Sequence, residues 1–495
     1  MKKKKFYITT SIAYTNALPH AGFALELAQA DVLARYYRGL GKDVFFLTGT
    51  DEHGKKVAKA AKEAGESPQE FTDKISSRFR ALTKILNISN SDFIRTTDKK
   101  RHWPSVKKVW LKLKAKGDIY KKKYQGLYCV GCEAFIVKKD LKGGKCRIHL
   151  RFPEIVEEEN YFFRLSKYSK KIGEILRSGK IKIAPQKRKN EMLSFVKQGL
   201  QDVSFSRPRV AETSSPLPPH FAPRKSAKDL SWGVPVPGDS KQTVYVWADA
   251  LVNYISLLEH ITKFKRYWPP DLHCLGKDIF KFHVLIWPGM ILSLGLPLPK
   301  AMLVHGFITV GGQKMSKSLG NVVDPFELVR KYGADAVRYF LLREIPATED
   351  GDFTHQKFEG RYNADLAGGL GNLVARVVAL AGKLKMQNVK RKTTTQSLKL
   401  KIEISKTWRK YHKTLKEFKF NEALSAVWGL IASCDRYIEK EQPWKESKKQ
   451  KEVIGHLLFV ISQIAEMVKP FLPETAEKIF EQLKIKKRKP LFPRV

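Results

Sequence analysis

The sequence predicts an α/β protein: a doubly wound, parallel-sheet (Rossmann-like) domain that carries a cysteine-bearing insertion and is followed by an all-α helical bundle. Three observations support this prediction. Strand-like and helix-like segments alternate at the start of the chain. This pattern stops near Gly117 and resumes at Tyr245. After Asp365 the apolar spacing is helical almost to the end of the chain.

The first part of the α/β domain alternates strand and helix. Residues 6–10 have the composition of a strand, and apolar residues between positions 23 and 37 fall on one helical face. Residues 44–47 form the continuous apolar run that is typical of a buried parallel strand. Ser67 and Glu70 have the spacing of a capping box, so we expect another helix to begin there.

The later segments follow the same reasoning. Residues 209–229 contain four prolines and many small polar residues, which predicts an exposed loop or insertion. Apolar spacing predicts helices over residues 366–384, 397–418 and 451–467. A chain of 495 residues has room for about three domains.

Composition limits the classes of function. Lys and Arg number 92 against 49 Asp and Glu, and the net charge of +43 favours a polyanionic partner such as nucleic acid. The lysines are spread along the whole chain, however, so a generally lysine-rich composition explains the charge equally well. No run of 18 apolar residues indicates a membrane span, and no apolar segment after the basic N-terminus indicates a secretory signal.

Cysteine spacing predicts a metal site. Cys129-x-x-Cys132 is followed, after thirteen residues, by Cys146-x-x-His149. Zinc prefers four tetrahedral ligands, and two closely spaced pairs supply them. A structural zinc is therefore favoured over unrelated thiols or a redox Cys-x-x-Cys pair. An odd number of cysteines with three of them clustered also fits a cytoplasmic protein better than a disulfide scaffold.

Two further motifs suggest phosphate binding. Pro-His-Ala-Gly-Phe at residues 19–23 lies between the first strand and the first helix, where free N–H groups and the helix dipole favour an anion. His20 can donate to a phosphate, and Gly22 permits close approach of a nucleotide. Glycines flank Lys314 and Lys317 in the segment 311–320, which has the composition of a mobile basic lid.

These two motifs together resemble the two signatures of class I aminoacyl-tRNA synthetases. Residues 314–318, Lys-Met-Ser-Lys-Ser, are identical to the second signature, and residues 20–23 resemble the first, His-x-Gly-His, with Phe23 in place of its second histidine. Further matches at residues 49–54, 245–249, 276–279 and 324–326 are similar to the methionine-specific members. The resemblance covers essentially the whole chain.

The resemblance implies an ATP-dependent ligase that converts L-methionine and ATP, with Mg²⁺, to methionyl-adenylate and pyrophosphate. The methionine would then pass to the 3′ end of tRNA(Met). The implied catalytic residues are His20, Lys314 and Lys317. The implied ATP contacts are His20, Gly22, Phe23, Lys277, Asp278, His305 and Lys317.

A pocket for an uncharged thioether must select by shape and soft contacts. Ile279, His283 and Trp287 recur every fourth residue and share one helical face, which is also typical of an ordinary core stripe. The resemblance places these three in the methionine pocket and assigns the substrate ammonium to Asp51. It completes the pocket with Ile12, Tyr14, Trp247, Ala250 and Tyr254.

The resemblance also divides the chain into parts. We expect the first half of the catalytic domain at 1–116, a connective insertion with a zinc knuckle at 117–232, and the second catalytic half with the lysine loop at 233–322. A stem-contact linker would follow at 323–365 and a helical anticodon-binding domain at 366–495. Asn372, Arg376 and Trp444 match the readers of the CAU anticodon, and the chain's end shortly after Phe492 favours a monomer.

Two alternatives stay open at this point. A sister synthetase for cysteine, valine, leucine or isoleucine shares the signatures, but the branched-chain enzymes carry a large editing insertion for which this chain has no room. A non-catalytic RNA-binding relative is suggested by Phe23, because a phenyl ring cannot donate to phosphate. We predict that Phe23→His leaves folding intact and does not reduce activation.

Overall fold

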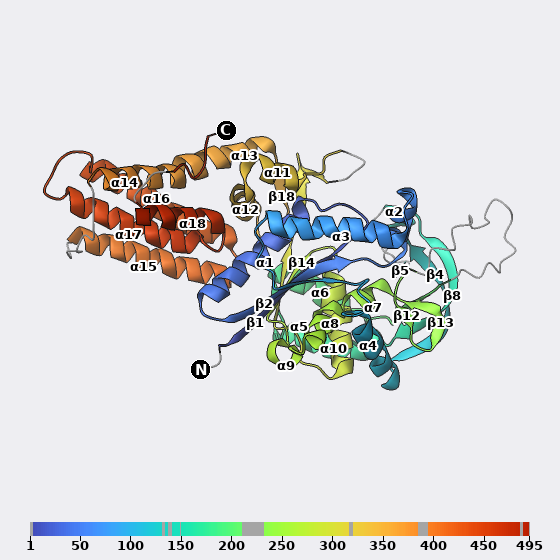
Figure 1. The fold of residues 1–495 in the computed structure, drawn as a ribbon. Coiled ribbons are helices and arrows are strands. Elements are labelled where there is room, and N and C mark those ends of the chain that lie inside the picture. Colours follow the sequence, from blue (N-terminus) through green and yellow to red (C-terminus); the bar gives the residue numbers. More distant parts are fainter. Residues whose placement is uncertain are drawn as a thin grey trace. The chain divides into compact units, whose positions relative to one another are not determined.

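A computed structural model describes residues 3–130, 134–136, 141–148, 150–209, 232–315, 320–384, 395–485 and 489–494 (Figure 1). The chain forms two compact units. The first unit comprises Met1–Leu18, Asp43–Ala81 and Asn90–Val304, and the second comprises Pro19–Lys42, Leu82–Ser89 and His305–Val495. Each unit is described by itself below.

The first unit is built on a six-stranded sheet with the order β3-β2-β1-β14-β15-β9. Its strands are β1 (Lys5–Tyr14), β2 (Asp43–Asp51), β3 (Asp92–Arg95), β9 (Lys182–Ala184), β14 (Leu272–Gly276) and β15 (Ala301–His305). The pairs of β1 with β2, of β1 with β14, of β2 with β3 and of β15 with β9 are all parallel. Because both faces of such a sheet are covered, β1 and β2 are buried along almost their whole length.

Helices surround this sheet, and they confirm the predicted fold class. They are α2 (Lys55–Glu63), α3 (Pro68–Ile85), α4 (Trp103–Ala115), η2 (Leu165–Tyr168), α5 (Ser169–Ser178), α6 (Gln186–Lys197), α7 (Val246–Ala250), α8 (Asn253–His260), α9 (Phe264–Tyr267), η4 (Phe282–Ile286) and α10 (Trp287–Leu294). The capping box is confirmed: Ser67 Oγ accepts from the Glu70 N–H at 3.3 Å, and Glu70 Oε2 accepts from the Ser67 N–H at 3.1 Å. The core contains side chains of α4, α8 and α10 together with the sheet, for example Trp110, Leu257 and Ile291.

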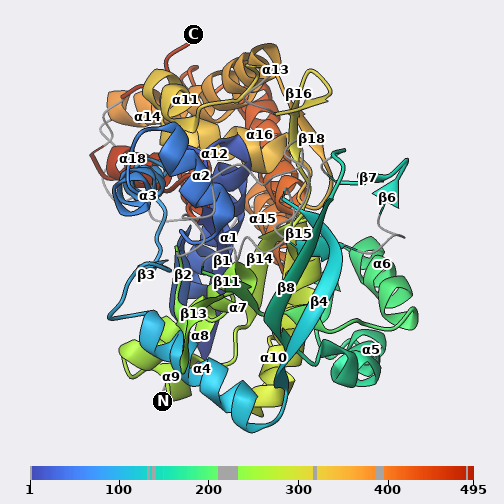
Figure 2. The same ribbon diagram turned by 90° about the vertical axis from the view of Figure 1, so that its right-hand side faces the viewer.

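A second, antiparallel sheet lies in the segment where the α/β pattern is interrupted (Figure 2). Its order is β10-β8-β4-β5, with β4 (Ile119–Cys129), β5 (Ala134–Ile136), β8 (Glu154–Phe163) and β10 (Val203–Ser204). Shorter strands are β6 (Leu141–Lys142), β7 (Lys145–Cys146), β11 (Ser206–Pro208), β12 (Pro235–Val236) and β13 (Asp239–Val244). The predicted loop at 209–229 lies outside the described residues except for Arg209.

The second unit is mainly helical. It contains α1 (Ala21–Gly39), α11 (Pro325–Tyr332), α12 (Ala334–Arg343), α13 (His355–Arg361), η6 (Tyr362–Gly371), α14 (Asn372–Lys383), α15 (Thr395–Lys416), α16 (Phe420–Glu441), α17 (Gln450–Val468) and α18 (Pro473–Ile485). A small sheet joins β16 (Ile308–Val310) to β17 (Gln313–Lys314) and β18 (Gly351–Phe353). The three helical segments expected from spacing are confirmed, and α16 and α18 agree with the expectation that the chain is helical almost to its end.

A buried arginine ties this unit together. Arg338 on α12 is fully buried and forms an ion pair with Asp31 of α1 at 2.7 Å. Its remaining donors reach the carbonyls of Leu86, Pro470 and Phe471. A buried guanidinium needs an ion-pair partner and hydrogen-bond acceptors for its N–H groups, because an unpaired buried charge is strongly destabilising.

Among the described residues, one helical stretch, His355–Lys383, is long and apolar enough to cross a membrane by length and composition alone. Leu370, Leu373, Val374 and Val377 within it are fully buried in the protein. Core helices pass the same test, so this stretch is weak evidence for a span.

Candidate active site

An aromatic cluster in the first unit brings together Trp247, Tyr254, His283 and Trp287, four of the nine predicted pocket residues. The Trp247 indole stacks on Phe282 with ring centroids 3.8 Å apart, and its edge-on contact with His283 is at 6.5 Å. Tyr254 contacts His283 at 5.8 Å and Trp287 at 5.7 Å. Residues from α7, α8, η4 and α10 therefore meet in one apolar wall, as an uncharged side chain requires.

Hydrogen bonds fix the protonation of His283. Its Nδ1 lies 3.1 Å from the Ile279 carbonyl, which can only accept, so Nδ1 carries the proton. Nε2 lies 2.8 Å from the Tyr254 hydroxyl and accepts from it. Burial lowers the pKa of His283 to about 4, so the ring is neutral near pH 7. The pocket thus presents a neutral polar group to an uncharged ligand.

The helix that carries these residues is not regular. Residues 282–286 form the π-helical turn η4 before α10 begins at Trp287. The predicted α-helical face of Ile279, His283 and Trp287 is therefore only approximate, because a π-turn holds more residues than an α-turn. Trp287 is fully buried, whereas Ile279 is half-buried.

The C-terminal end of β2 places Asp51 at the edge of the sheet. Asp51 pairs with Tyr14 and Gly49 pairs with Ile12, so these predicted residues share the β1–β2 register. The Asp51 carbonyl accepts from the Thr15 backbone N–H at 3.0 Å. Ligands of open α/β sheets bind beyond the carboxyl ends of strands, which is where the Asp51 carboxyl lies.

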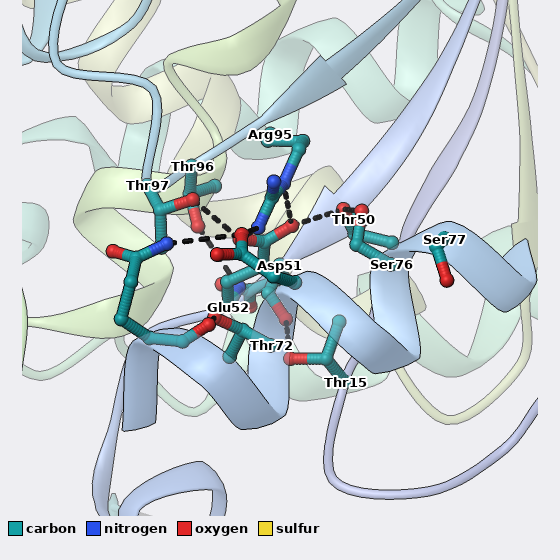
Figure 3. A network of polar contacts seen from close by, with 12 residues as sticks. Thr15, Thr50, Asp51, Glu52, Thr72, Ser76, Ser77, Arg95, Thr96 and Thr97 are labelled. Atoms are coloured by element: carbon teal, nitrogen blue, oxygen red, sulfur yellow. Dashed lines mark hydrogen bonds and ion pairs between the residues drawn. The ribbon is translucent and has the colours of Figure 1, made fainter. Parts of the chain in front are cut away.

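The residue after Asp51 anchors this loop (Figure 3). Glu52 is fully buried and accepts from Arg95 at 2.7 and 2.8 Å. The hydroxyls of Thr50 and Thr97 donate to the same carboxylate at 2.5 Å each. Arg95 also pairs with Asp73 at 2.5 Å; burial by itself lowers the pKa of Arg95, but the Glu52 and Asp73 carboxylates outweigh it and the pKa lies above its ordinary value. The backbone at Asp51 is therefore held rigidly.

The remaining candidates of this unit have varied exposure. Ala250 and Tyr254 are buried. Lys277 and Asp278 follow the end of β14; Lys277 is half-buried and Asp278 is exposed. Their position at a strand's carboxyl edge fits nucleotide contact.

In the second unit, His20 is the N-cap of α1. It is exposed, and its Nδ1 accepts from the Gly22 N–H at 3.0 Å. A Cβ on Gly22 would lie 2.8 Å from His20 Cε1, so a side chain at this position would push the imidazole away from the Gly22 N–H. Phe23 is buried, so its ring is not presented at the helix terminus as a histidine of the first signature would be.

The lysine loop is partly described. Lys314 is exposed at the end of β17, with its Nζ 4.9 Å from the Phe307 ring centroid. Lys317 lies outside the described residues. His305 is buried; its Nδ1 donates to the Gly306 carbonyl at 2.8 Å, and its Nε2 lies 2.9 Å from Glu26.

The structure describes two of the four candidate zinc ligands. Cys129 ends β4 and Cys146 ends β7; both are buried and neither forms a disulfide. Cys132 and His149 lie outside the described residues. Cys129 pairs with Ala134 in the antiparallel ladder of β4 and β5. No metal-binding group of three ligands occurs among the residues that are described.

The three candidate anticodon readers lie in the helical unit. Asn372 is exposed at the start of α14, and one turn later Arg376 pairs with Glu439 of α16 at 2.9 Å. Trp444 is 47% exposed in the connection between α16 and α17. An exposed indole of this kind is available to stack on a base.

Sequence reasoning missed several buried polar residues beside the pocket. Asp249 accepts from His53 Nδ1 at 2.6 Å and from His102 Nε2 at 2.8 Å. Burial by itself raises the pKa of Asp249, but the two imidazoles outweigh it and the pKa lies below its ordinary value. His53 lies in the motif at 49–54 and Asp249 lies in the motif at 245–249. Membership in these two motifs was the signal that could have identified both residues.

Comparison with known proteins agrees with this geometry. The family model of class I tRNA synthetases (M) matches residues 6–146 and 136–378, and that of the anticodon-binding domain of tRNA ligases matches 400–492. The chain is 40% identical to a methionine–tRNA ligase of Thermotoga maritima, over 98% of this chain and 76% of the relative. It is equally identical to one of Brucella suis, over 98% of this chain and 93% of the relative.

Solved structures give the same result. The structure of Mycobacterium tuberculosis methionyl-tRNA synthetase in complex with methionyl-adenylate superposes with a TM-score of 0.90 at 36% identity. The alignment covers 99% of this chain and 100% of that one. The free form of the same protein gives a TM-score of 0.81 at 31% identity.

Proposed function

The chain belongs to the methionine-type class I tRNA synthetases, and from this premise we propose that it is a methionine–tRNA ligase that forms methionyl-adenylate from L-methionine and ATP and then charges tRNA. The observation that carries the proposal is the aromatic wall of Trp247, Tyr254 and Trp287 around a neutral His283. Such a wall selects a thioether by shape and offers no charge that would favour a polar competitor.

The first step needs positioning rather than a protein nucleophile. The methionine carboxylate attacks the α-phosphate and pyrophosphate leaves, so the protein must align the reactants and stabilise charge. Asp51 would bind the substrate ammonium. His20 at the start of α1 would donate to phosphate oxygens through Nε2, because its Nδ1 already accepts from Gly22.

Further contacts with the nucleotide are assigned to charged and imidazole side chains. Lys314 and Lys317 would bind the leaving phosphates, and Lys277, Asp278 and His305 would contact ATP. Mg²⁺ would accompany the nucleotide and neutralise phosphate charge. The second step passes the methionyl group to the 3′ ribose of tRNA(Met).

A structural zinc is proposed for Cys129, Cys132, Cys146 and His149. The burial of the Cys129 and Cys146 thiols at two strand ends supports it, because thiolates at paired turns are the donors that zinc prefers. The metal would cross-link the segments of this insertion that carry the four ligands. Metal analysis of the purified chain should give one zinc per protein, which the paired substitution Cys129→Ser and Cys146→Ser removes.

The tRNA-binding part is assigned to the helical unit. Asn372, Arg376 and Trp444 would read a CAU anticodon, since an amide, a guanidinium and an exposed indole provide base-edge and stacking contacts. The division at 116, 232, 322 and 365, a monomeric state and a cytoplasmic location complete the proposal. Reduced, buried cysteines support the location.

Amino-acid-dependent ATP–pyrophosphate exchange tests the activity. The wild-type chain should exchange with methionine and far less with cysteine, valine, leucine or isoleucine. His20→Ala should lower the exchange rate, whereas Phe23→His should not. Absence of exchange in folded, zinc-loaded protein that still binds tRNA would favour the non-catalytic RNA-binding alternative, which Phe23 suggests.

A further inference from the structure

We propose that the buried relay His53–Asp249–His102–Ser256 is a positioning device that aligns three walls of the methionine pocket; this inference rests on the proposed function. The relay is defined by those four residues, all of which lie in the first unit. All four are buried to 98% or more of their surface. None of them is needed to contact the ligand.

The Asp249 carboxylate is the centre of the relay. Oδ2 accepts from His53 Nδ1 at 2.6 Å, and Oδ1 accepts from His102 Nε2 at 2.8 Å. His102 Nδ1 lies 2.9 Å from the Ser256 hydroxyl. Within the described part of the chain, Asp249 forms ion pairs with His53 and His102 and with no lysine or arginine, so loss of either imidazole leaves its buried charge poorly satisfied.

The position of the relay in the sequence suggests its purpose. His53 follows Asp51 by two residues, Asp249 follows Trp247 by two, and Ser256 follows Tyr254 by two. The single carboxylate therefore connects the β2 loop that would hold the substrate ammonium with the two aromatic walls on α7 and α8. His102 is the N-cap of α4 and adds a fourth element.

Aromatic contacts stiffen the same junction. The His53 ring packs edge-on against Trp103 at 6.0 Å and Trp232 at 5.6 Å. Trp232 Nε1 in turn donates to the Glu52 carbonyl at 2.5 Å. A shift of Asp249 is thus transmitted to Glu52 and His53, the two residues that directly follow Asp51. Misplacement of a substrate-positioning group by about 1 Å is enough to cost about 100-fold in rate.

The central test is Asp249→Asn in the full chain, measured by pyrophosphate exchange. Asparagine has the same size as aspartate, but its side-chain NH₂ group faces the N–H of one of the two histidines. Two donors cannot pair, so Asp249→Asn breaks one of the two hydrogen bonds. We expect the KM for methionine to rise about 10- to 100-fold. The KM for ATP should stay at the wild-type value, a split that general destabilisation would not produce.

Asp118→Asn is the matched control. Asp118 is an equally buried carboxylate of the same unit, held by Lys167, Tyr168 and Ser293. None of these partners is within two residues of a predicted pocket position. Asp118→Asn should lower thermal stability as much as Asp249→Asn does, but it should leave the KM for methionine unchanged.

Conservative variants give a second readout if Asp249→Asn folds poorly. His53 donates through Nδ1, and the side-chain amide of asparagine can occupy the position of that nitrogen. His102 donates through Nε2, and the side-chain amide of glutamine can occupy the position of that nitrogen. His53→Asn and His102→Gln should retain most methionine affinity, whereas His53→Leu and His102→Leu should lose it.

The outcomes separate this inference from the proposed function. If the wild type exchanges with methionine but Asp249→Asn and His53→Leu raise its KM no more than Asp118→Asn does, the relay is only structural and the inference is wrong. If the wild type shows no exchange, the proposed function fails, and calorimetric titration of methionine into the same variants decides the relay. A wild type that binds no methionine overturns both.

Discussion

At the scale of single residues, the pocket works through neutral histidines. His283 is neutral because burial outweighs its hydrogen bond to the Ile279 carbonyl. His273 lies 6.3 Å from it, ring to ring, with Nδ1 2.7 Å from the Thr9 hydroxyl. Burial and the proximity of His283 also lower the pKa of His273. Two imidazoles this close can pack under an apolar ligand only when neither is charged.

The depressed pKa of His283 predicts a pH dependence of stability. The pKa of His283 is about 6.5 in the unfolded chain and about 4 in the folded protein. Between these two pH values the unfolded chain binds a proton at His283 and the folded protein does not. The free energy of unfolding therefore falls as the pH is lowered through this window, by up to ~1.4 kcal/mol per pH unit. His283→Gln should remove that part of the slope in urea unfolding at pH 4.5, 5.5, 6.5 and 7.5. An unchanged slope would mean that His283 protonates normally in the folded state.

At the scale of elements, β1, β2, α1, α3, α14, α15 and α17 could be predicted because each has a local signal. The apolar run of β2 and the Ser67–Glu70 capping box needed no tertiary information. The π-turn η4 and the relay around Asp249 have no such signal, since they arise from packing between segments some 150 to 200 residues apart. Phe282, which stacks on Trp247, was missed for the same reason.

The close packing of β2 against β3 makes a prediction for Gly49. A Cβ at this position would lie 2.1 Å from the Ile94 carbonyl oxygen, and the register of the parallel pair prevents Ile94 from moving away. Gly49→Ala should therefore destabilise the chain by about 2 kcal/mol or more and weaken methionine binding through Asp51. Gly39→Ala is the control, because that site in α1 is open and alanine favours helix. Thermal unfolding and methionine titration of both variants check this; equal stability would contradict it.

At the scale of the whole molecule, the two units carry different chemistry. The first unit holds the aromatic pocket and the relay, and the second holds His20, Lys314 and the helical bundle with its candidate base readers. A net charge of +43 attracts a nucleic-acid backbone whatever its sequence, so backbone binding alone would give little specificity. Specific recognition would then have to come from a few exposed side chains, for which Trp444 is the proposed candidate.

This division predicts a variant that separates the two steps of the reaction. Trp444→Ala removes an exposed indole from the α16–α17 connection, in a different unit from the proposed pocket residues. Loss of one base stack, about 1–3 kcal/mol, should raise the KM for tRNA(Met) roughly 5- to 150-fold while methionine-dependent pyrophosphate exchange stays at the wild-type rate. Lys445→Ala, an exposed neighbour, should change aminoacylation far less, because one phosphate contact among many is lost. Parallel loss of exchange and aminoacylation in Trp444→Ala would show that the indole supports the fold rather than the anticodon.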